Sequence, residues 1–398
     1  MLPTLASRFG TPLYVYDLAV VRARARALKA AISWTPFQPL YAVKANPCPA
    51  VVRAILAEGF GIDAVSPGEV ALALRLGVPP ALIQYTENNM TDAEQGEALA
   101  QGVTVTAGSL DRLERLASAG ATRASVRFNP DIGAGHSDKV CTGGPLSKFG
   151  VHHTDVAAVR AIEGRSALRV VGCHMHIGSG FLDAGDYVRA MEVILAIAGR
   201  LPHLEFIDFG GGLGIPYQDD QQPIDLAAVG AAATRLMAAF CASYGRRLEL
   251  RLEPGRFLVA EAGTLLTTVT SRKTYPATAT AAARTYIGTD TGFNHLVRPT
   301  MYGSYHRIAQ LSNPSAPTET VDVVGNICES GDIFARDRVM PRCVPGDLLA
   351  IRDAGAYGFA MASTYNLRPL PAEVAIDGDA VVLARRRQTV DELLAAWA

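Results

Sequence analysis

From residue 39 onwards, short apolar runs alternate with segments in which apolar residues recur at helical spacing. The runs predict buried strands at 39–45, 61–66, 81–86, 103–107, 124–128, 168–177, 204–209 and 247–253, and helices follow the first seven. Ahead of them, residues 12–16 predict a short strand and residues 18–32 a helix. Eight strands that alternate with helices, over a span near the ~250 residues of a typical barrel, favour a (β/α)8 barrel over an open parallel sheet.

Polar residues mark where several of these helices begin and end. Ser66 and Thr91 each stand three residues before a glutamate, which predicts two capping boxes. Glycines stand where C-terminal caps belong, at positions 59, 77, 102 and 120.

After residue 257 the pattern changes to Thr- and Val-rich runs separated by Gly and Pro turns. The runs at 264–270, 320–324 and 348–352 predict strands, and therefore a β domain. The Ala- and Thr-rich stretch 274–284 is expected to be an exposed loop or hairpin, and a short helix is expected at 390–397. The predicted fold is thus α/β, with a C-terminal β domain.

Composition argues against several classes of function. The chain has 398 residues, 49% of them apolar, and a net charge of -1, so no overall field attracts nucleic acid or an anionic membrane. The six cysteines lack metal-type spacing and suit free thiols in a reducing cytoplasm. We find no signal peptide and no apolar run long enough to span a bilayer, so a cytoplasmic protein is expected.

Polar side chains stand where the predicted strands end, which is where barrel enzymes place their chemistry. They are Lys44, Asp63, Arg127, His174, His176, Asp208 and Glu253. Lys44 alone among the lysines ends an apolar strand, where partial desolvation would lower its pKa and leave a neutral amine able to attack an aldehyde. The alternative is a lysine that extends its charged end to solvent.

Three glycine-bearing segments follow the last three predicted strands, at 177–180, 210–214 and 253–256. Successive glycines let backbone N–H groups approach and surround a phosphate. Each segment alone could be an ordinary tight turn. Together they favour a phosphate site, because barrels often bind phosphate at the loops after their last strands.

His174 and His176 alternate along a predicted strand, so their side chains are expected on the same face. A metal pair is conceivable, but the sequence places no carboxylate or cysteine ligand with them, so we expect no metal; a ring stacked on a flat ligand is the other interpretation. Glu253 ends the last predicted strand, so it is expected at the same end of the barrel as the histidines. A carboxylate that faces a heteroaromatic nitrogen keeps it protonated and makes the ring an electron sink. The alternative is an ion pair with Arg251 or Arg256.

Nine stretches, in order along the chain, make this sequence resemble the fold-type III pyridoxal-phosphate-dependent amino acid decarboxylases. They are YAVKAN, VSPGE, TGGPLSKFG, HMHIGSG, DFGGGLG, EPGR, GFNHLVRPTMYGSYH, CESGDIFARDR and DAGAYGFAMASTYNLRP. Within that family the likeness is strongest to the branch that acts on meso-diaminopimelate. The resemblance implies an alanine-racemase-like barrel that binds pyridoxal 5'-phosphate at residues 20–260, and a β domain formed by residues 1–19 and 261–398.

The resemblance also implies roles for individual residues. Lys44 would bind the cofactor covalently, His176 would stack on its ring, and Glu253 would pair with the ring nitrogen. Asp63 and Arg127 would support the ring and the lysine. The residues around the phosphate or the adjoining substrate pocket would be Ser179, Gly211, Gly212, Gly255, Arg256 and Tyr357.

Other matching residues concern the substrate and a second subunit. Arg298 and Tyr302 match the residues that hold the distal carboxylate in the diaminopimelate enzymes, a group that an arginine fork can bind bidentately. Cys328, a candidate proton donor, and Glu329, which would take the distal amine, would reach into the partner's site. The resemblance therefore implies a homodimer with shared active sites. Residues 130–143 match a loop that covers the substrate and varies among relatives.

The expected reaction is decarboxylation of a diamino acid, with meso-diaminopimelate giving L-lysine and CO2 in lysine biosynthesis. A paralogue acting on another carboxylated amine, or on ornithine or lysine, remains open. A racemase of the same fold type would need a partner tyrosine as second base rather than the CESGD stretch. A non-catalytic pyridoxal-phosphate carrier would lack the β domain, and a structural or interaction protein would need none of the polar strand ends.

Overall fold

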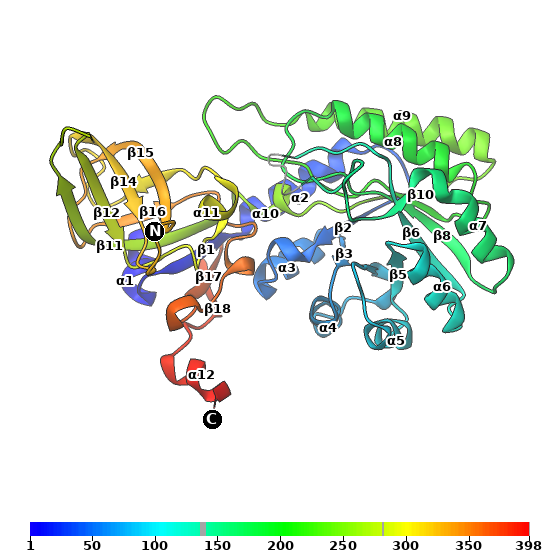
Figure 1. The fold of residues 1–398 in the computed structure, drawn as a ribbon, viewed down its shortest axis with the longest axis horizontal. Helices are drawn as coiled ribbons and strands as arrows, with labels where there is room; N and C mark the ends of the chain where they lie inside the picture. The colour runs from blue at the N-terminus through cyan, green and yellow to red at the C-terminus, as the bar shows by residue number, and fades with distance from the viewer. Residues whose placement is uncertain (136–140, 281, 398) are drawn as a thin grey trace.

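The computed structural model describes every residue except 136–140, 281 and 398. It shows two lobes: a barrel ringed by helices and a separate β domain (Figure 1).

The barrel is a closed ring of parallel strands in the order β5-β4-β3-β2-β10-β9-β8-β6, with β5 and β6 paired to close it. The strands are β2 (Phe37–Ala42), β3 (Gly61–Ala64), β4 (Ile83–Thr86), β5 (Thr104–Ala107), β6 (Arg123–Asn129), β8 (Arg169–His174), β9 (Phe206–Asp208) and β10 (Glu249–Leu252). The predicted (β/α)8 barrel is therefore confirmed. A short strand, β7 (Val151–His152), pairs with the C-terminal end of β6.

Helices follow the first seven barrel strands as predicted. They are α3 (Pro49–Leu56), α4 (Pro67–Arg75), α5 (Asp92–Ala100), α6 (Leu110–Ser118), α7 (Val156–Gly164), α8 (Gly185–Ala198) and α9 (Leu226–Tyr244). The capping box at Thr91 is complete. At Ser66 it is not, because the Glu69 side chain accepts from the backbone N–H of Val65 instead. The four glycines predicted as caps all have positive φ.

Helix α9 corrects one expectation, because its 19 residues are long and apolar enough to cross a membrane. Length and composition are weak evidence, and the helix packs on α8 and on α2 (Leu18–Ala31), with Met237 among its buried residues. At Gly230 it approaches α2 so closely that a Cβ would lie 1.9 Å from the carbonyl oxygen of Ala31. This packing is typical of an outer barrel helix.

The β domain is built on a sheet in the order β15-β14-β12-β11-β1-β17-β18, with β16 pairing with β11 and β13. Its strands are β1 (Leu13–Asp17), β11 (Gly263–Tyr275), β12 (Arg284–Thr289), β13 (Ile308–Gln310), β14 (Thr318–Val324), β15 (Ile333–Pro341), β16 (Leu348–Ile351), β17 (Ala372–Asp377) and β18 (Ala380–Arg385). Strands β11 and β12 form the hairpin predicted around 274–284. Its helices are α1 (Leu2–Phe9), α11 (Arg298–Tyr302) and α12 (Val390–Leu394).

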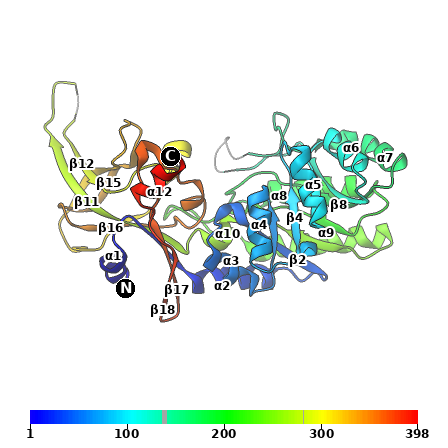
Figure 2. The same cartoon turned by 90° about the horizontal axis from the view of Figure 1, so that it is seen from below.

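The two lobes are joined at two points of the chain. Strand β1 lies between β11 and β17 and leads directly into α2, which packs against β17 (Figure 2). The short helix α10 (Arg256–Val259) follows the last barrel strand and leads into β11. An N-terminal segment and the C-terminal third thus form one sheet.

Candidate active site

Lys44 lies in a single turn of 3-10 helix that follows β2, not in the strand itself. Its Nζ donates to Oδ2 of Asp63 at 2.9 Å, and Asp63 is fully buried. Burial lowers the pKa of Lys44, but the charges of Asp63, Tyr357 and Glu253 together more than offset it, so the net pKa is raised. The expected fall in pKa was wrong, because the Asp63 carboxylate stabilises the ammonium form.

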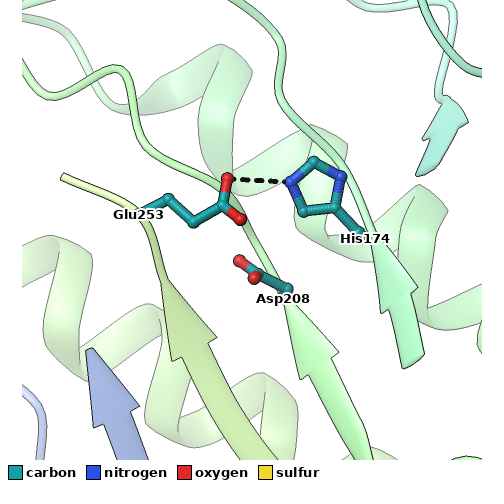
Figure 3. A group of neighbouring side chains, drawn as sticks. All are labelled: His174, Asp208 and Glu253. Carbon is teal, nitrogen blue, oxygen red and sulfur yellow. Dashed lines mark hydrogen bonds and ion pairs between the residues drawn. The ribbon is translucent and has the colours of Figure 1, made fainter. Parts of the chain in front are cut away.

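His174, Asp208 and Glu253 stand at the ends of β8, β9 and β10 and point toward one another (Figure 3). His174 Nε2 lies 2.9 Å from Oε2 of Glu253. Burial lowers the pKa of His174 to about 4. The imidazole is therefore neutral at pH 7, and a single proton is shared between its Nε2 and the carboxyl group of Glu253.

Gln84 on β4 joins the two carboxylates. Its Nε2 donates to Oδ2 of Asp208 and to Oε1 of Glu253, both at 2.9 Å, while its Oε1 accepts from Arg251 at 2.9 Å. Burial raises the pKa of each of these acids to about 8. Within the described residues Glu253 pairs with neither arginine that the sequence offered as its partner, and its two oxygens meet Gln84 and His174 instead.

These three side chains offer ligand atoms within 4.8 Å of one another. The expectation that no carboxylate accompanies the histidines was therefore wrong, because β9 and β10 bring two. The oxygens of these two acids are already hydrogen-bonded to Gln84 and His174, so we interpret the group as a hydrogen-bonded network. The lack of a metal stays a prediction.

His176 lies two residues beyond the end of β8, because the strand stops at His174. Its Nδ1 accepts from the backbone N–H of Gly211 at 3.1 Å, and its carbonyl oxygen accepts from Nη2 of Arg127 at 3.0 Å. Arg127 in turn lies over the ring of Phe149. The two histidines thus have separate partners, and His176 is held by the glycine loop.

The three glycine-bearing loops pack directly against one another. Gly212 has φ +104, and a Cβ there would lie 2.3 Å from the carbonyl oxygen of Gly178. Gly180 N–H donates to the carbonyl oxygen of Gly212 at 2.8 Å. A Cβ at Gly211 would lie 2.1 Å from the carbonyl oxygen of Glu253. Only glycine allows the loops after β8, β9 and β10 to approach this closely.

Arg256 and Arg298 lie side by side and are 4% and 1% exposed. Each donates from Nη1 to the hydroxyl oxygen of Tyr217, at 3.0 and 2.8 Å. Their Nη2 atoms donate to Ser179 Oγ and Ser304 Oγ, at 3.0 and 3.2 Å. Among the described residues neither arginine has a carboxylate partner, and the Nε of each is buried without an acceptor. Two buried cations without an acid fit an anionic ligand.

The segment around Tyr357 connects the β domain to the turn that carries Lys44. Its backbone N–H donates to the carbonyl oxygen of Ala45 at 2.8 Å, and Asn46 Nδ2 donates to the carbonyl oxygen of Gly355 at 2.8 Å. The Arg256 guanidinium lies 4.9 Å from the centre of the Tyr357 ring. Gly255 packs against the same turn. The site therefore lies at the junction of the two lobes.

The structure does not bring every expected residue together. Cys328 and Glu329 are exposed in the loop between β14 and β15, and no hydrogen bond or ion pair between described residues joins them to Lys44. Tyr302 ends α11, one turn from Arg298. In the expected covering loop, residues 136–140 lie outside the described residues.

Two site residues were missed by sequence reasoning. Gln84 carried a signal, because it is a polar residue inside a strand whose every residue is buried. Tyr217 carried none, because it lies in the irregular segment between β9 and α9 and its partners are far away in the sequence.

The chain matches the family described as "Pyridoxal-dependent decarboxylase, pyridoxal binding domain" over residues 18–260. The chain belongs to this family of pyridoxal-dependent decarboxylases. It is 45% identical to the diaminopimelate decarboxylase of Methanothermobacter thermautotrophicus, over 98% of this chain and 92% of that protein. It is 37% identical to the enzyme of the same name from Escherichia coli K12, over 98% and 94%.

Solved structures agree with the sequence comparison. The crystal structure of Helicobacter pylori diaminopimelate decarboxylase in complex with L-lysine superimposes with a TM-score of 0.92, at 29% identity. The match covers 100% of this chain and 99% of that one. The likeness thus extends over both lobes.

The residues present fit pyridoxal phosphate. Lys44 supplies the amine, and Glu253 is a buried acid in the barrel mouth. The unpaired Nε of Arg256 marks a cationic position beside the glycine loops. A primary amine, an acid for a ring nitrogen and a cationic phosphate site are the groups this cofactor requires.

Proposed function

We propose that the chain is a pyridoxal-phosphate-dependent carboxy-lyase that converts meso-diaminopimelate to L-lysine and CO2. The observation that supports this substrate is Arg298, which is buried beside Arg256 and has no carboxylate partner among the described residues. A substrate with a second carboxylate supplies that partner, whereas lysine or ornithine leaves Arg298 unpaired at a cost in free energy.

Several groups in the site would hold the cofactor. Lys44 would bind it covalently, and His176, oriented by Gly211, would cover one face of its ring. Glu253 would meet the ring nitrogen, and Arg256 with Ser179 would bind the phosphate. Arg127 fixes the backbone of His176, and Asp63 holds the amine of Lys44. The other residues around the phosphate would be Gly211, Gly212, Gly255 and Tyr357.

The chemistry that the bound cofactor supplies is an electron sink for the electrons left behind when CO2 departs. The carboxyl group of Glu253 is fixed by hydrogen bonds with His174 Nε2 and Gln84 Nε2, so it would need no rearrangement to share a proton with the ring nitrogen. Lys44 gives up a proton before its amine can act as a nucleophile, and Asp63, at 2.9 Å, keeps that amine in place.

The other end of the substrate meets the β domain. Arg298 and Tyr302 would bind the distal carboxylate, and Glu329 the distal amine. Cys328 would deliver the proton that replaces the lost carboxyl group at the α-carbon. Cys328 and Glu329 are exposed, and no hydrogen bond or ion pair among the described residues joins them to Lys44, so we assign these roles to the site of the second subunit of a homodimer.

A substrate panel tests the proposal. Release of CO2 is measured with meso-diaminopimelate, L-lysine and L-ornithine at equal concentrations. We expect meso-diaminopimelate to have the highest kcat/KM. Equal or better turnover of lysine or ornithine would assign the chain to a different substrate while leaving it a decarboxylase. The cytoplasmic location stays a prediction.

A further inference from the structure

The side chain of Tyr217 bonds to both buried arginines. Its hydroxyl oxygen accepts from Nη1 of Arg256 at 3.0 Å and from Nη1 of Arg298 at 2.8 Å. The Arg298 guanidinium also lies 4.9 Å from the centre of the Tyr217 ring. A single phenolic oxygen therefore sets the distance between two cationic groups that come from different lobes.

The surroundings of Tyr217 fix it independently of the arginines. Its backbone N–H donates to Oε1 of Gln221 at 2.8 Å, and its ring meets the edge of the His306 ring at a centroid distance of 5.5 Å. Burial lowers the pKa of His306 to about 3, so that imidazole is neutral and adds no positive charge to the pair. His306 is itself anchored through Nδ1, 2.9 Å from the carbonyl oxygen of Arg352.

The electrostatics favour the hydroxyl oxygen of Tyr217 as a hydrogen-bond acceptor for both arginines. Burial raises the pKa of Tyr217, yet Arg256 and Arg298 lower it by more, so the net pKa is lowered. Two guanidiniums that share one acceptor repel each other less than two without one. With Nη1 committed to the phenol, each arginine presents its remaining N–H groups in a fixed direction.

We propose that Tyr217 is a positioning residue that orients Arg298 relative to Arg256 and so selects substrates with a distal carboxylate. This inference rests on the proposed function and extends it to a residue that touches no reacting atom. The substrate class is an α-amino acid that carries a second carboxylate at the far end of its side chain. A substrate without that group gains nothing from the orientation of Arg298.

Tyr217→Phe tests the role, because it keeps the ring and removes only the shared oxygen. Loss of a hydrogen bond to a charged group corresponds to roughly a ten- to hundredfold effect. We expect KM for meso-diaminopimelate to rise by about that factor, with kcat and the visible absorbance of bound cofactor little changed. For L-lysine, kcat/KM is expected to stay within about twofold, so the ratio of kcat/KM for the two substrates falls. Tyr244→Phe, which removes a half-buried hydroxyl at the far end of α9, is the matched control.

A merely structural role would lower kcat/KM for both substrates together and leave their ratio unchanged, and that result overturns the proposal. Loss of cofactor absorbance in Tyr217→Phe also overturns it, because the residue would then serve the phosphate. If the unmodified enzyme shows no preference for meso-diaminopimelate, the proposed function itself has failed.

A second measurement does not depend on turnover. Binding of pimelate, a plain dicarboxylate, is followed by calorimetry with the unmodified protein and with both variants. Weaker binding to Tyr217→Phe alone supports the positioning of the arginine pair, whatever the natural substrate is. Equal binding to all three proteins contradicts it.

Discussion

Nζ of Lys44 lies 2.9 Å from Oδ2 of Asp63, a carboxylate on the neighbouring strand with no exposed surface. The pair holds the lysine as an ammonium group, although a third of its side chain is exposed (33%). The nucleophile is thus stored in its charged form beside a fixed base, and it becomes reactive only when that proton leaves.

The first prediction concerns covalent attachment. Purified protein with pyridoxal phosphate should absorb visible light, and borohydride should fix the cofactor on Lys44, because its Nζ is held by the buried Asp63. Peptide mapping of the reduced protein checks the position. Lys44→Ala should bind no cofactor covalently, whereas Lys273→Ala, on the far hairpin, should behave as the unmodified chain. Labelling at Lys148 or Lys273 would contradict the assignment.

The second prediction concerns Glu253. Glu253→Gln keeps the size and the contact with Gln84 but cannot hold a proton on a ring nitrogen. We expect cofactor absorbance to remain while kcat falls by at least about tenfold, which corresponds to ~1.4 kcal/mol of barrier per tenfold. Glu249→Gln, at the opposite end of the same strand, is the control and should retain activity. Near-normal turnover in Glu253→Gln would leave that residue with a structural role only.

The third prediction is a pH dependence of stability. Burial raises the pKa of Asp208 from 3.8 to about 8. A group whose pKa is raised on folding stabilises the protein fully at low pH, and this contribution is lost as pH rises through about 8. Between pH 5 and 8, the free energy of unfolding of the cofactor-free protein should therefore fall more steeply than that of Asp208→Asn, by up to ~1.4 kcal/mol per pH unit.

Urea unfolding at several pH values measures this difference, with the exposed Asp379→Asn as control. Parallel curves for the unmodified protein and Asp208→Asn would show that Asp208 does not titrate in this range. The comparison between variants is needed because other buried acids, such as Glu373, also have raised pKa values.

The sequence predicted the barrel well because its strands are buried on both faces and read as apolar runs. It failed at strand ends for the same reason. Val43 and Ala45 are as buried in their turn as they would be in a strand, so the run continued past the end of β2. Met175 and Ile177 are likewise fully buried beyond the end of β8. Hydrophobicity records burial, whereas the end of a strand is set by backbone hydrogen bonds.

The candidate site was predicted where chemistry follows a strand end, as at Asp63 and Glu253. It was not predicted where the partners come from several distant segments. Tyr217 binds Arg256 from the end of the barrel and Arg298 from the β domain, and no local sequence pattern predicts contacts between residues so far apart in the chain. The roles of Cys328 and Glu329 came only from the family resemblance, because a single chain leaves them exposed.

The fourth prediction concerns the shared site. Lys44→Ala and Glu329→Ala should each be inactive as homodimers, because each lacks a required group in both sites. Mixing the two after subunit exchange should restore up to roughly a quarter of full activity, since half of the dimers are hybrids and each hybrid holds one intact site. Exchange is verified with differently tagged chains. No recovery despite demonstrated exchange would mean that each chain builds its own site.

The last prediction concerns the distal carboxylate. Arg298 is 1% exposed and among the largest buried side chains, and the hydrogen bonds found for its guanidinium among the described residues go to two hydroxyl groups, those of Tyr217 and Ser304. Burial lowers its pKa, which shows that its charge is incompletely compensated by the residues around it. A carboxylate would compensate that charge, so Arg298→Ala should lose about ten- to hundredfold in kcat/KM for meso-diaminopimelate. The cofactor absorbance should change little, since Arg298 belongs to the β domain and not to the lysine cluster.

The exposed Arg336→Ala is the control for loss of a positive charge from the same domain. Arg298→Lys guards against a folding defect, because it keeps the charge and most of the volume but cannot form two parallel hydrogen bonds. It should fold and still show an intermediate loss. If Arg298→Ala folds but keeps its preference for meso-diaminopimelate over lysine, the distal carboxylate is bound elsewhere. The arginine pair would then serve the phosphate alone, and selection for a second carboxylate would have to come from the partner subunit.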